Sequence, residues 1–477
     1  MTTGLNFWDV PVWSFVLTMF FLFFSMMVAN TLRNIIRPLR KMMIPSSVLG
    51  GLLLLLADFI CRQVSGKALV SSSTLEMLTY HGLGLGFVAM ALRNMEKKQD
   101  QRSRTGGFDS GVTVVSTYLI QALVGLLITM VCYYLLDSFW ASGLLLPMGF
   151  GQGPGQAYNW GHTYETIYGF TDGTSFGLTI AAMGFLSASI GGVIYLNILR
   201  KRGVIQGSRE DQVSEVLTSE EINGVNEIPM SESMDKFSVQ IALAFIAYIA
   251  AFLFMKGIDA IVTTGVLGNF GYNTVRPLVW GFNFLIGTLF ALLEKAVLKG
   301  LKKTGVIKRE YTNNFMQNRI SGFLFDLMVV ASIAAIRLDA FTERPFIIPL
   351  SLICVAGAVV SYLYLNPLCA KVFPQYRHEA FLSLYGMLTG TVSTGVILLR
   401  EVDPRFETQA ADNLVYHQPW AIVFGFPMLL LLPVAPQTET KGWVTLGIVV
   451  LLFLVMQLIL FRRQIFKRGK ENGSAIK

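Results

Sequence analysis

Two glycine-rich segments interrupt apolar stretches of the chain, one in each half. The first contains Gly151, Gly153 and Gly155 around Pro154. Glycine permits positive φ and close backbone approach, and proline cannot continue a helix, so this segment predicts a break between two short helices. Such a break frees N–H groups that attract a carboxylate and carbonyl groups that can coordinate a cation.

Three amide side chains lie in or beside the first break. Gln152, Gln156 and Asn159 can donate hydrogen bonds to an anion or accept them from an ammonium group. A close helix-packing motif would account for the glycines, but not for three amides in an apolar segment. We therefore expect a substrate-binding set made of Gly151, Gln152, Gly153, Gly155, Gln156 and Asn159.

Hydroxyl side chains lie in the second segment, between Gly386 and Gly395. Hydroxyl and carbonyl oxygens are the hard ligands that small cations use. Hydroxyls in membrane helices also bond to the carbonyl one turn back, which is a purely structural alternative. We expect Gly390, Thr391, Ser393 and Thr394 to contribute to the substrate site, and Thr389 and Thr391 to contribute to ion coupling.

One carboxylate stands inside an apolar stretch. Asp326 is flanked by Phe325 and Leu327. A carboxylate at membrane depth is costly and is a functional hypothesis by default. Asp326 could couple an ion by binding sodium or relaying a proton, or it could pair with Arg319, and the sequence leaves these roles open.

Common catalytic patterns are absent from the sequence. The four histidines form no metal-binding pair, and there is no phosphate-binding P-loop, no serine nucleophile motif and no Cys-x-x-Cys pair. The chain therefore lacks the parts of an ATP-driven pump and of an embedded hydrolase. We expect a protein that is not an enzyme and has no cofactor or metal beyond a coupling sodium ion.

The elements that position these residues are apolar. The chain has 477 residues, of which 53% are hydrophobic and 14% are charged, against roughly 25% charged in a soluble domain. This predicts an all-α polytopic membrane protein, with 144–163 and 380–399 as re-entrant helical hairpins. The expected spans are 8–30, 43–60, 74–92, 111–136, 173–198, 237–256, 277–298, 318–337, 345–365, 419–435 and 443–461.

Basic residues follow alternate spans. The net charge of +8 is distributed over the segments after the first, third, fifth, seventh and last spans, so it does not indicate a nucleic-acid partner. By the positive-inside rule, the N-terminus lies outside and the C-terminus in the cytoplasm. The alternation requires each hairpin to return to the side of the membrane from which it enters. The first hairpin then enters from outside and the second from the cytoplasm.

A polar stretch, 204–236, divides the chain. Its richness in Glu, Ser and Asn predicts a cytoplasmic linker. On either side, 1–203 and 237–436 have the same design of five spans and one hairpin. Because five spans precede the linker, the second repeat starts from the opposite side and the two are inverted. Residues 437–477 add an extra span and a basic cytoplasmic tail.

Several motifs match one family of membrane proteins. They are 43–51, Gly82 to Arg93, Gly151 with Gly153 and Gly155, Tyr168 to Thr171, Gly191 with Gly192, and Gly386 with Gly390 and Thr394. On these motifs the chain resembles the bacterial sodium:glutamate symporter family. Gln152 stands where the family usually has histidine, Pro154 where it has threonine, and Ser393 where it has proline.

The resemblance implies an elevator-type transporter of the bacterial cytoplasmic membrane. The hairpins would belong to a moving transport domain, and the first, second, seventh and eighth spans to a scaffold that forms a homodimer. The implied activity is sodium-coupled symport of glutamate or a related acidic amino acid or carboxylate, so the partners are a small anion, sodium and lipid. Two alternatives remain: a proton-coupled transporter or exporter that uses Asp326, and a channel or non-transporting receptor.

Overall fold

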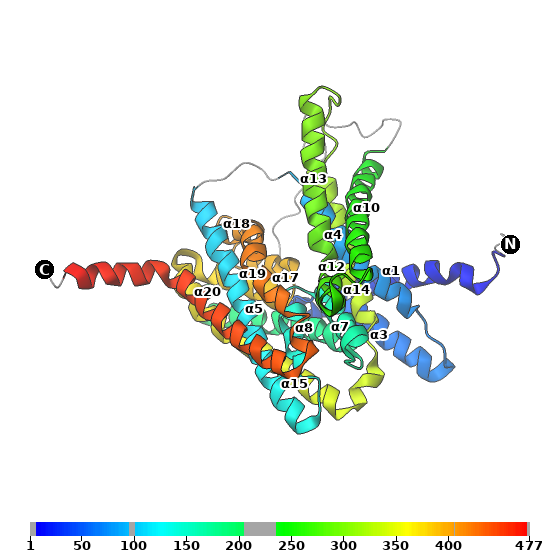
Figure 1. Cartoon of the computed structure of the whole chain (residues 1–477), viewed down its shortest axis with the longest axis horizontal. Helices are drawn as coiled ribbons and strands as arrows, with labels where there is room; N and C mark the ends of the chain where they lie inside the picture. The colour runs from blue at the N-terminus through cyan, green and yellow to red at the C-terminus, as the bar shows by residue number, and fades with distance from the viewer. Residues whose placement is uncertain (1–5, 95–100, 205–234, 405, 475–477) are drawn as a thin grey trace. The chain divides into compact units, whose positions relative to one another are not determined.

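The structure is a computed structural model that describes residues 6–94, 101–204, 235–404 and 406–474. Nearly all of the expected linker, 205–234, lies outside these residues, and Lys236 already begins a helix. Every regular element in the described part is a helix, with no β-strand (Figure 1). The predicted all-α class is confirmed at this level.

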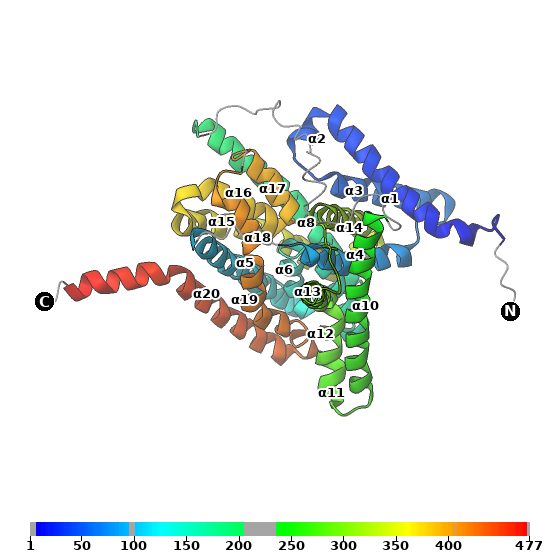
Figure 2. The same cartoon turned by 90° about the horizontal axis from the view of Figure 1, so that it is seen from above.

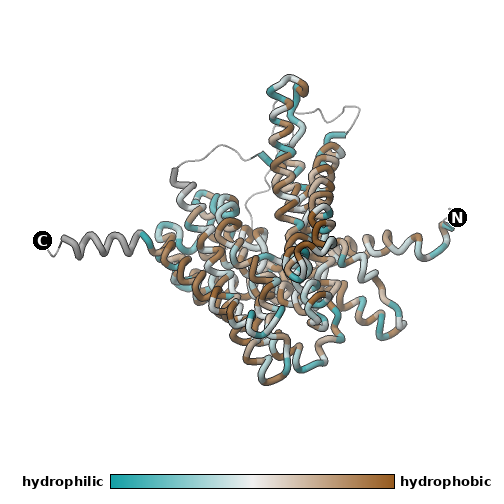
Figure 3. The backbone as a smooth tube through the Cα atoms, viewed as in Figure 1, coloured by the Kyte–Doolittle hydropathy of each residue, from teal (hydrophilic) through white to brown (hydrophobic). Residues whose placement is uncertain are grey.

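Nine helices in the described ranges are long and apolar enough to cross a membrane. Brown, hydrophobic backbone runs along most of them in Figure 3. This pattern indicates a membrane-spanning protein, as expected. The nine are α1 (Val10–Ile35), α3 (Ser46–Ser65), α4 (Ser72–Leu92), α5 (Gln101–Leu136), α8 (Gly173–Lys201), α10 (Lys236–Thr263), α15 (Arg344–Val372), α19 (Gln418–Leu431) and α20 (Glu439–Ser474).

Two expected spans differ from these nine. The eighth span corresponds to α14 (Asn314–Ala334), which is helical but carries Arg319 and Asp326. The seventh, 277–298, was expected to be continuous, and the structure divides it into α12 (Arg276–Gly281) and α13 (Asn283–Lys303). The division occurs because the backbone leaves the helical region at Phe282, with φ −104° and ψ 28°. A three-residue helix, α11 (Gly268–Phe270), and the π-helical turn η2 (Gly271–Val275) precede α12.

The chain divides into two compact units that interleave in sequence. Unit 1 contains Met1–Ala29, Leu49–Lys97 and Arg209–Ala335, and unit 2 contains Asn30–Val48, Lys98–Ser208 and Ile336–Lys477. Each unit therefore takes segments from both sides of the polar stretch. Both glycine-broken segments fall in unit 2.

Unit 1 is built around α4, which packs against α10, α13 and α14 (Figure 2). Hydrogen bonds among three polar side chains, of which Tyr248 and Asn283 are buried, connect three of these helices. Nδ1 of His81 lies 3.0 Å from the hydroxyl of Tyr248, and Nδ2 of Asn283 donates to the same hydroxyl at 3.3 Å. A membrane offers no water to such groups, so their mutual pairing fixes the register of α4, α10 and α13.

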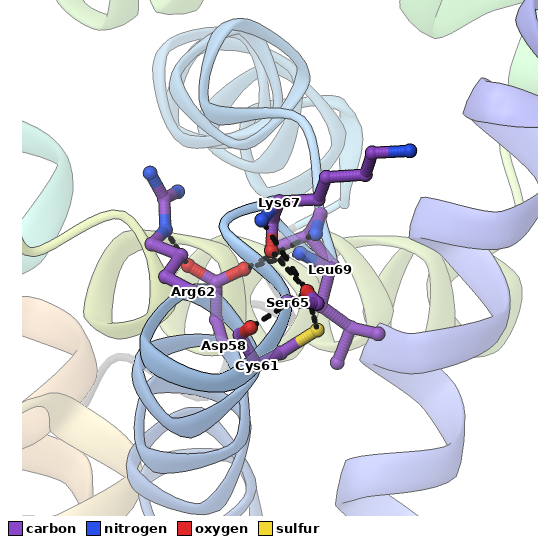
Figure 4. Close-up of polar contacts among 7 residues, drawn as sticks. Asp58, Cys61, Arg62, Ser65, Lys67 and Leu69 are labelled. Atoms are coloured by element: carbon purple, nitrogen blue, oxygen red, sulfur yellow. Dashed lines mark hydrogen bonds and ion pairs between the residues drawn. The ribbon is translucent and has the colours of Figure 1, made fainter.

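The turn between α3 and α4 is held by one carboxylate, shown in Figure 4. Asp58 accepts hydrogen bonds from Nε of Arg62 at 2.6 Å and from the backbone N–H groups of Leu69 at 2.7 Å and Val70 at 3.3 Å. Its side chain thus caps a loop at the end of a span. This is a structural role, in keeping with the position of Asp58 near the end of the second expected span.

Unit 2 has α5, α8 and α15 as its long helices, with the shorter elements packed between and around them. Its core contains Leu196, Leu365, Phe381, Tyr385 and Leu398. The shorter elements are α2 (Arg37–Lys41), η1 (Trp140–Leu144), α6 (Leu145–Phe150), α7 (Pro154–Tyr168), η3 (Leu338–Thr342), η4 (Pro374–Tyr376), α16 (Arg377–Thr389), α17 (Val392–Arg400), α18 (Gln409–Tyr416) and η5 (Ala435–Gln437).

The extra helix α20 packs against α5 in unit 2. Nη2 of Arg462 donates to Asp109 at 2.8 Å, and Nε2 of Gln457 donates to Ser116 at 2.6 Å. Gln457 also donates to the hydroxyl of Tyr364 on α15 at 2.6 Å. The helix α20 is therefore fastened to two long helices of this unit.

Candidate substrate site at two helix breaks

The first break separates α6 from α7. Gly153 is the N-cap of α7 and has φ +87° and ψ −177°, a conformation that only glycine adopts readily. Pro154 follows at the first helical position, where its missing N–H and fixed φ suit a helix start. Glycine has no side chain with which to cap this N-terminus. The glycines and the proline therefore produce the break that the sequence predicted.

The first break is the turn of a helical hairpin. The ring of Phe139, just before η1, stacks on Phe170 at a centroid distance of 4.7 Å and lies 5.6 Å from Tyr164 near the end of α7. The chain therefore returns to the end from which it started. The residues at the turn are Gly151, Gln152 and Gly153.

The second break is also the turn of a hairpin. The helix α16 ends at Thr389, and α17 begins at Val392 after the non-helical Gly390 and Thr391. The two arms touch, because a Cβ built on Gly386 would lie 2.8 Å from Cα of Gly395. Thr391 is the N-cap of α17, and its own side chain makes no capping hydrogen bond.

The two hairpins approach the middle of α8 from its opposite ends. The open end of the first lies beside the start of α8, and that of the second lies beside its end. Both turns lie near Gly184, midway along the helix. The contacts in order along α8 are Gly173 with Gly161, Gly177 with Ala157, Gly184 with Phe150 and Thr389, and Arg200 with Glu401.

The two turns also meet each other. A Cβ built on Gly153 would lie 3.7 Å from Cγ2 of Thr391 and 3.9 Å from the carbonyl oxygen of Gly390. The N-caps of α7 and α17 are therefore neighbours. Each helix N-terminus has the effect of roughly half a positive charge, so this arrangement suits an anion placed between the two helix starts.

The expected substrate residues divide into turn residues and buried residues. Gly151, Gln152, Gly153, Gly390 and Thr391 lie at the two turns, which the structure brings together, and Ser393 is exposed on the first turn of α17. The rest are buried on the helices that flank the turns. These are Gly155, Gln156 and Asn159 on α7 and Thr394 on α17.

The expected ion-coupling residues come from both units. The hydroxyl of Thr389 donates to the carbonyl of Tyr385 at 2.7 Å, which is the structural alternative for such side chains. The hydroxyl of Thr391 lies 3.4 Å from that of Thr394. Asp326 belongs to α14 in unit 1, with an exposed side chain, whereas the hairpins belong to unit 2.

Two residues of α5 contact the hairpins, one at each break, and neither was identified from the sequence. The hydroxyl of Tyr118 donates to the carbonyl of Gly151 at 3.1 Å, and Nε2 of Gln121 donates to the carbonyl of Leu388 at 3.0 Å. Their only sequence signal was a phenol and an amide three residues apart inside an apolar span. A search for such polar pairs would have found them.

Charged residues fasten the open end of the first hairpin. Nη2 of Arg337 lies 2.6 Å from Glu165 and 3.1 Å from Asp172, and the N–H of Thr174 donates to Glu165 at 2.9 Å. Burial raises the pKa of the Glu165 carboxyl, but the hydrogen bonds from Thr174 and Arg337 outweigh burial and the pKa lies below its ordinary value. Glu165 is therefore ionised at neutral pH.

Within the described ranges, no group of three or more His, Cys, Asp or Glu side chains is placed to hold a metal ion. Comparison with protein-family models, curated proteins and solved structures found no match. The fold therefore defines the class only as an all-helical, membrane-spanning protein, and the two adjoining hairpin turns define its candidate site.

Proposed function

We propose that the protein is a secondary active transporter that carries glutamate or a related acidic amino acid or carboxylate by sodium-coupled symport. The observation that supports this most is the meeting of two helix N-termini, at Gly153 and Thr391, within one unit. Broken helices with N-termini directed at a central site are how many transporters bind anionic groups at membrane depth.

The binding energy would come from backbone groups and amides. A helix N-terminus stabilises an anion by about 0.3–1 kcal/mol when exposed and up to about 2 kcal/mol when partly buried. The half-buried amide of Gln152, at the first turn, can add a hydrogen bond. A carboxylate held in this way needs no arginine from the hairpins.

Inverted repeats and an elevator movement belong to the same proposal. The approach of the hairpins from opposite ends of α8 supports inversion of the halves 1–203 and 237–436. Both turns belong to unit 2, so this unit would be the transport domain and unit 1 the scaffold of a homodimer. The proposed setting is a bacterial cytoplasmic membrane, with the N-terminus outside and the C-terminus in the cytoplasm.

Sodium would supply the driving force. Carbonyl groups at the ends of α6 and α16 and the hydroxyl of Thr391 are oxygen donors near the turns. At 100 mV, negative inside, each sodium ion gains roughly 2.3 kcal/mol from the potential. An anionic substrate loses the same amount for each negative charge that it carries inward, so the potential favours uptake only when the sodium ions outnumber the negative charges of the substrate.

The test is uptake by the purified full-length protein in liposomes. Radiolabelled glutamate, aspartate and an unsubstituted dicarboxylate are offered with an inward sodium gradient, with sodium replaced by choline, and with a proton gradient alone. We expect saturable uptake that requires sodium. Uptake driven by protons alone and abolished in Asp326→Asn would establish the proton-coupled alternative instead. A flux that does not saturate would indicate a channel.

A further inference from the structure

We propose that Tyr118 and Gln121 of α5 are positioning residues that hold the two hairpin turns in place relative to each other. This inference rests on the proposed function, because it names groups that would shape the proposed anion site. It also has a readout, the stability of the turns, that does not depend on transport.

At the first turn, Tyr118 replaces a lost helical hydrogen bond. The carbonyl of Gly151 lies just past the end of α6, where the helical hydrogen-bond pattern stops. The hydroxyl of Tyr118 donates to it at 3.1 Å. The aromatic ring also lies against the turn, because a Cβ built on Gly151 would be 2.1 Å from Cε1 of Tyr118. Glycine at 151 thus allows the phenol to reach the backbone.

At the second turn, Gln121 likewise donates a hydrogen bond to a carbonyl at the end of a helix. Leu388 is the second-last residue of α16, so its carbonyl also lies in the final turn of a helix. Nε2 of Gln121 donates to this carbonyl at 3.0 Å and to the hydroxyl of Ser361 on α15 at 2.9 Å. Gln121 is 0% exposed. The amide therefore joins α5, α15 and the second hairpin.

The donor end of Gln121 explains why an amide stands at this position. Its carbonyl oxygen is buried and accepts no hydrogen bond from the part of the chain that the structure describes. A buried polar atom left in this state is costly. The two hydrogen bonds from Nε2 offset the cost of the unpaired oxygen. One is made to the second hairpin and the other to α15.

One helix thus contacts both turns. Tyr118 and Gln121 are three residues apart and lie on one face of α5. Each break contains only two or three non-helical residues, so a shift of either carbonyl also shifts the helix start that follows it. The N-caps Gly153 and Thr391 lie beyond these carbonyls, and their separation would be set through α5.

The test begins with hydrogen exchange of the full-length protein in lipid nanodiscs, followed by mass spectrometry. Tyr118→Phe removes one hydroxyl, and Gln121→Met keeps the side-chain length without the donor. We expect the first variant to speed exchange several-fold in 148–156 and the second in 386–395. Thr117→Val is the matched control, since the hydroxyl of Thr117 bonds only to the carbonyl of Thr113 on α5 among the hydrogen bonds seen.

Uptake by the same variants supplies the second readout. We expect KM for the transported anion to rise about 5- to 10-fold in each single variant, the effect of losing one hydrogen bond at a buried group. The maximal rate should change less. The double variant should be non-additive, because both residues act on the distance between the same two turns. Thr117→Val should leave KM unchanged.

The outcomes separate the two proposals. Unchanged exchange at both turns overturns the positioning role, whatever the transport result. Altered exchange with unchanged KM keeps the bracing of the turns but overturns its effect on the anion site. If the wild-type protein transports no anion while exchange responds as expected, the proposed function fails and the bracing of the turns stands. Should Gln121→Met fail to fold, Gln121→Asn, which shortens the reach to Leu388, is tested with the same expectations.

Discussion

Gly184 of α8 packs directly against the carbonyl of Thr389, the last residue of α16. A Cβ built on Gly184 would lie 2.4 Å from that oxygen and 3.0 Å from the ring of Phe150. The middle of one long helix therefore touches the ends of both arms that lead into the hairpin turns. Because Gly184 has no side chain, the second hairpin can approach the first closely.

A side chain at Gly184 should push the second hairpin away. Gly184→Val would force the backbone at Thr389 to move, and overpacking of this kind costs about 1–3 kcal/mol. We expect a lower thermal unfolding temperature and a loss of most uptake. Gly447→Ala in α20 is the matched control, because no heavy atom lies within 4 Å of its Cβ position. An active, stable Gly184→Val protein would contradict the close packing.

A β-carbon at Gly153 should strain the first turn. Its φ of +87° and ψ of −177° cost a residue with a Cβ about 1–3 kcal/mol. We expect Gly153→Ala to lose substrate-dependent thermal stabilisation, because the helix start at Pro154 shifts. Gly203, with φ +70° and no neighbour within 4 Å, is the control. If Gly203→Ala impaired binding as strongly, the effect of Gly153→Ala would reflect general instability.

The two threonines beside the second turn should differ. Thr389 donates its hydroxyl to its own helix at 2.7 Å, whereas the hydroxyl of Thr391 has a longer contact, 3.4 Å, with Thr394. We expect Thr391→Val to weaken anion or sodium binding about 5- to 10-fold, the effect of one hydrogen bond. Thr389→Val should change binding less than twofold. Titrations followed by thermal shift would measure both, and equal effects would argue against a role for Thr391 at the site.

Acid should loosen the open end of the first hairpin. The folded state depresses the pKa of Glu165 below its ordinary value of 4.5. The stabilisation is therefore present above that ordinary value and is lost as the pH falls through the folded pKa. Because Arg337 is half exposed, the gain is only about 1 kcal/mol or less.

The unfolding temperature between pH 6 and pH 3.5 would measure this loss. We expect a steeper fall for the wild type than for Glu165→Gln. Asp172, which shares Arg337, is present in both proteins. Glu310→Gln removes a more exposed pair with Lys302 and should follow the wild type. Parallel curves for all three proteins would show that the Glu165 pair adds no stability.

Much of the fold could be predicted because each span carries its own signal. Long apolar runs predicted α1, α8 and α20. Gly153 and Pro154 predicted a helix break from their own backbone preferences, without reference to neighbouring helices. The continuous seventh span was wrong, since hydropathy does not register the change of backbone conformation at Phe282. The interleaving of the two units could not be predicted either, because it depends on contacts between helices that are distant in the chain.

The two helix breaks could be predicted from the sequence, whereas the residues of α5 that contact them could not. Glycine and proline report local backbone conformation, so the turns could be found from neighbouring residues alone. Gln121 reaches Leu388, which is 267 residues away, and nothing near Gln121 in the chain indicates that partner. Asp326 was chosen for its chemistry, and its position in unit 1 depends on how α14 packs.

The attachment of α20 bears on the order in which the protein can be completed during synthesis. α5, which carries Tyr118 and Gln121, leaves the ribosome well before α20, because Gln457 and Arg462 lie 341 and 353 residues after their partners Ser116 and Asp109 on α5. Domains generally acquire their structure as their segments emerge. Unit 2 must therefore wait, partly assembled in the membrane, until α20 arrives to pack against α5.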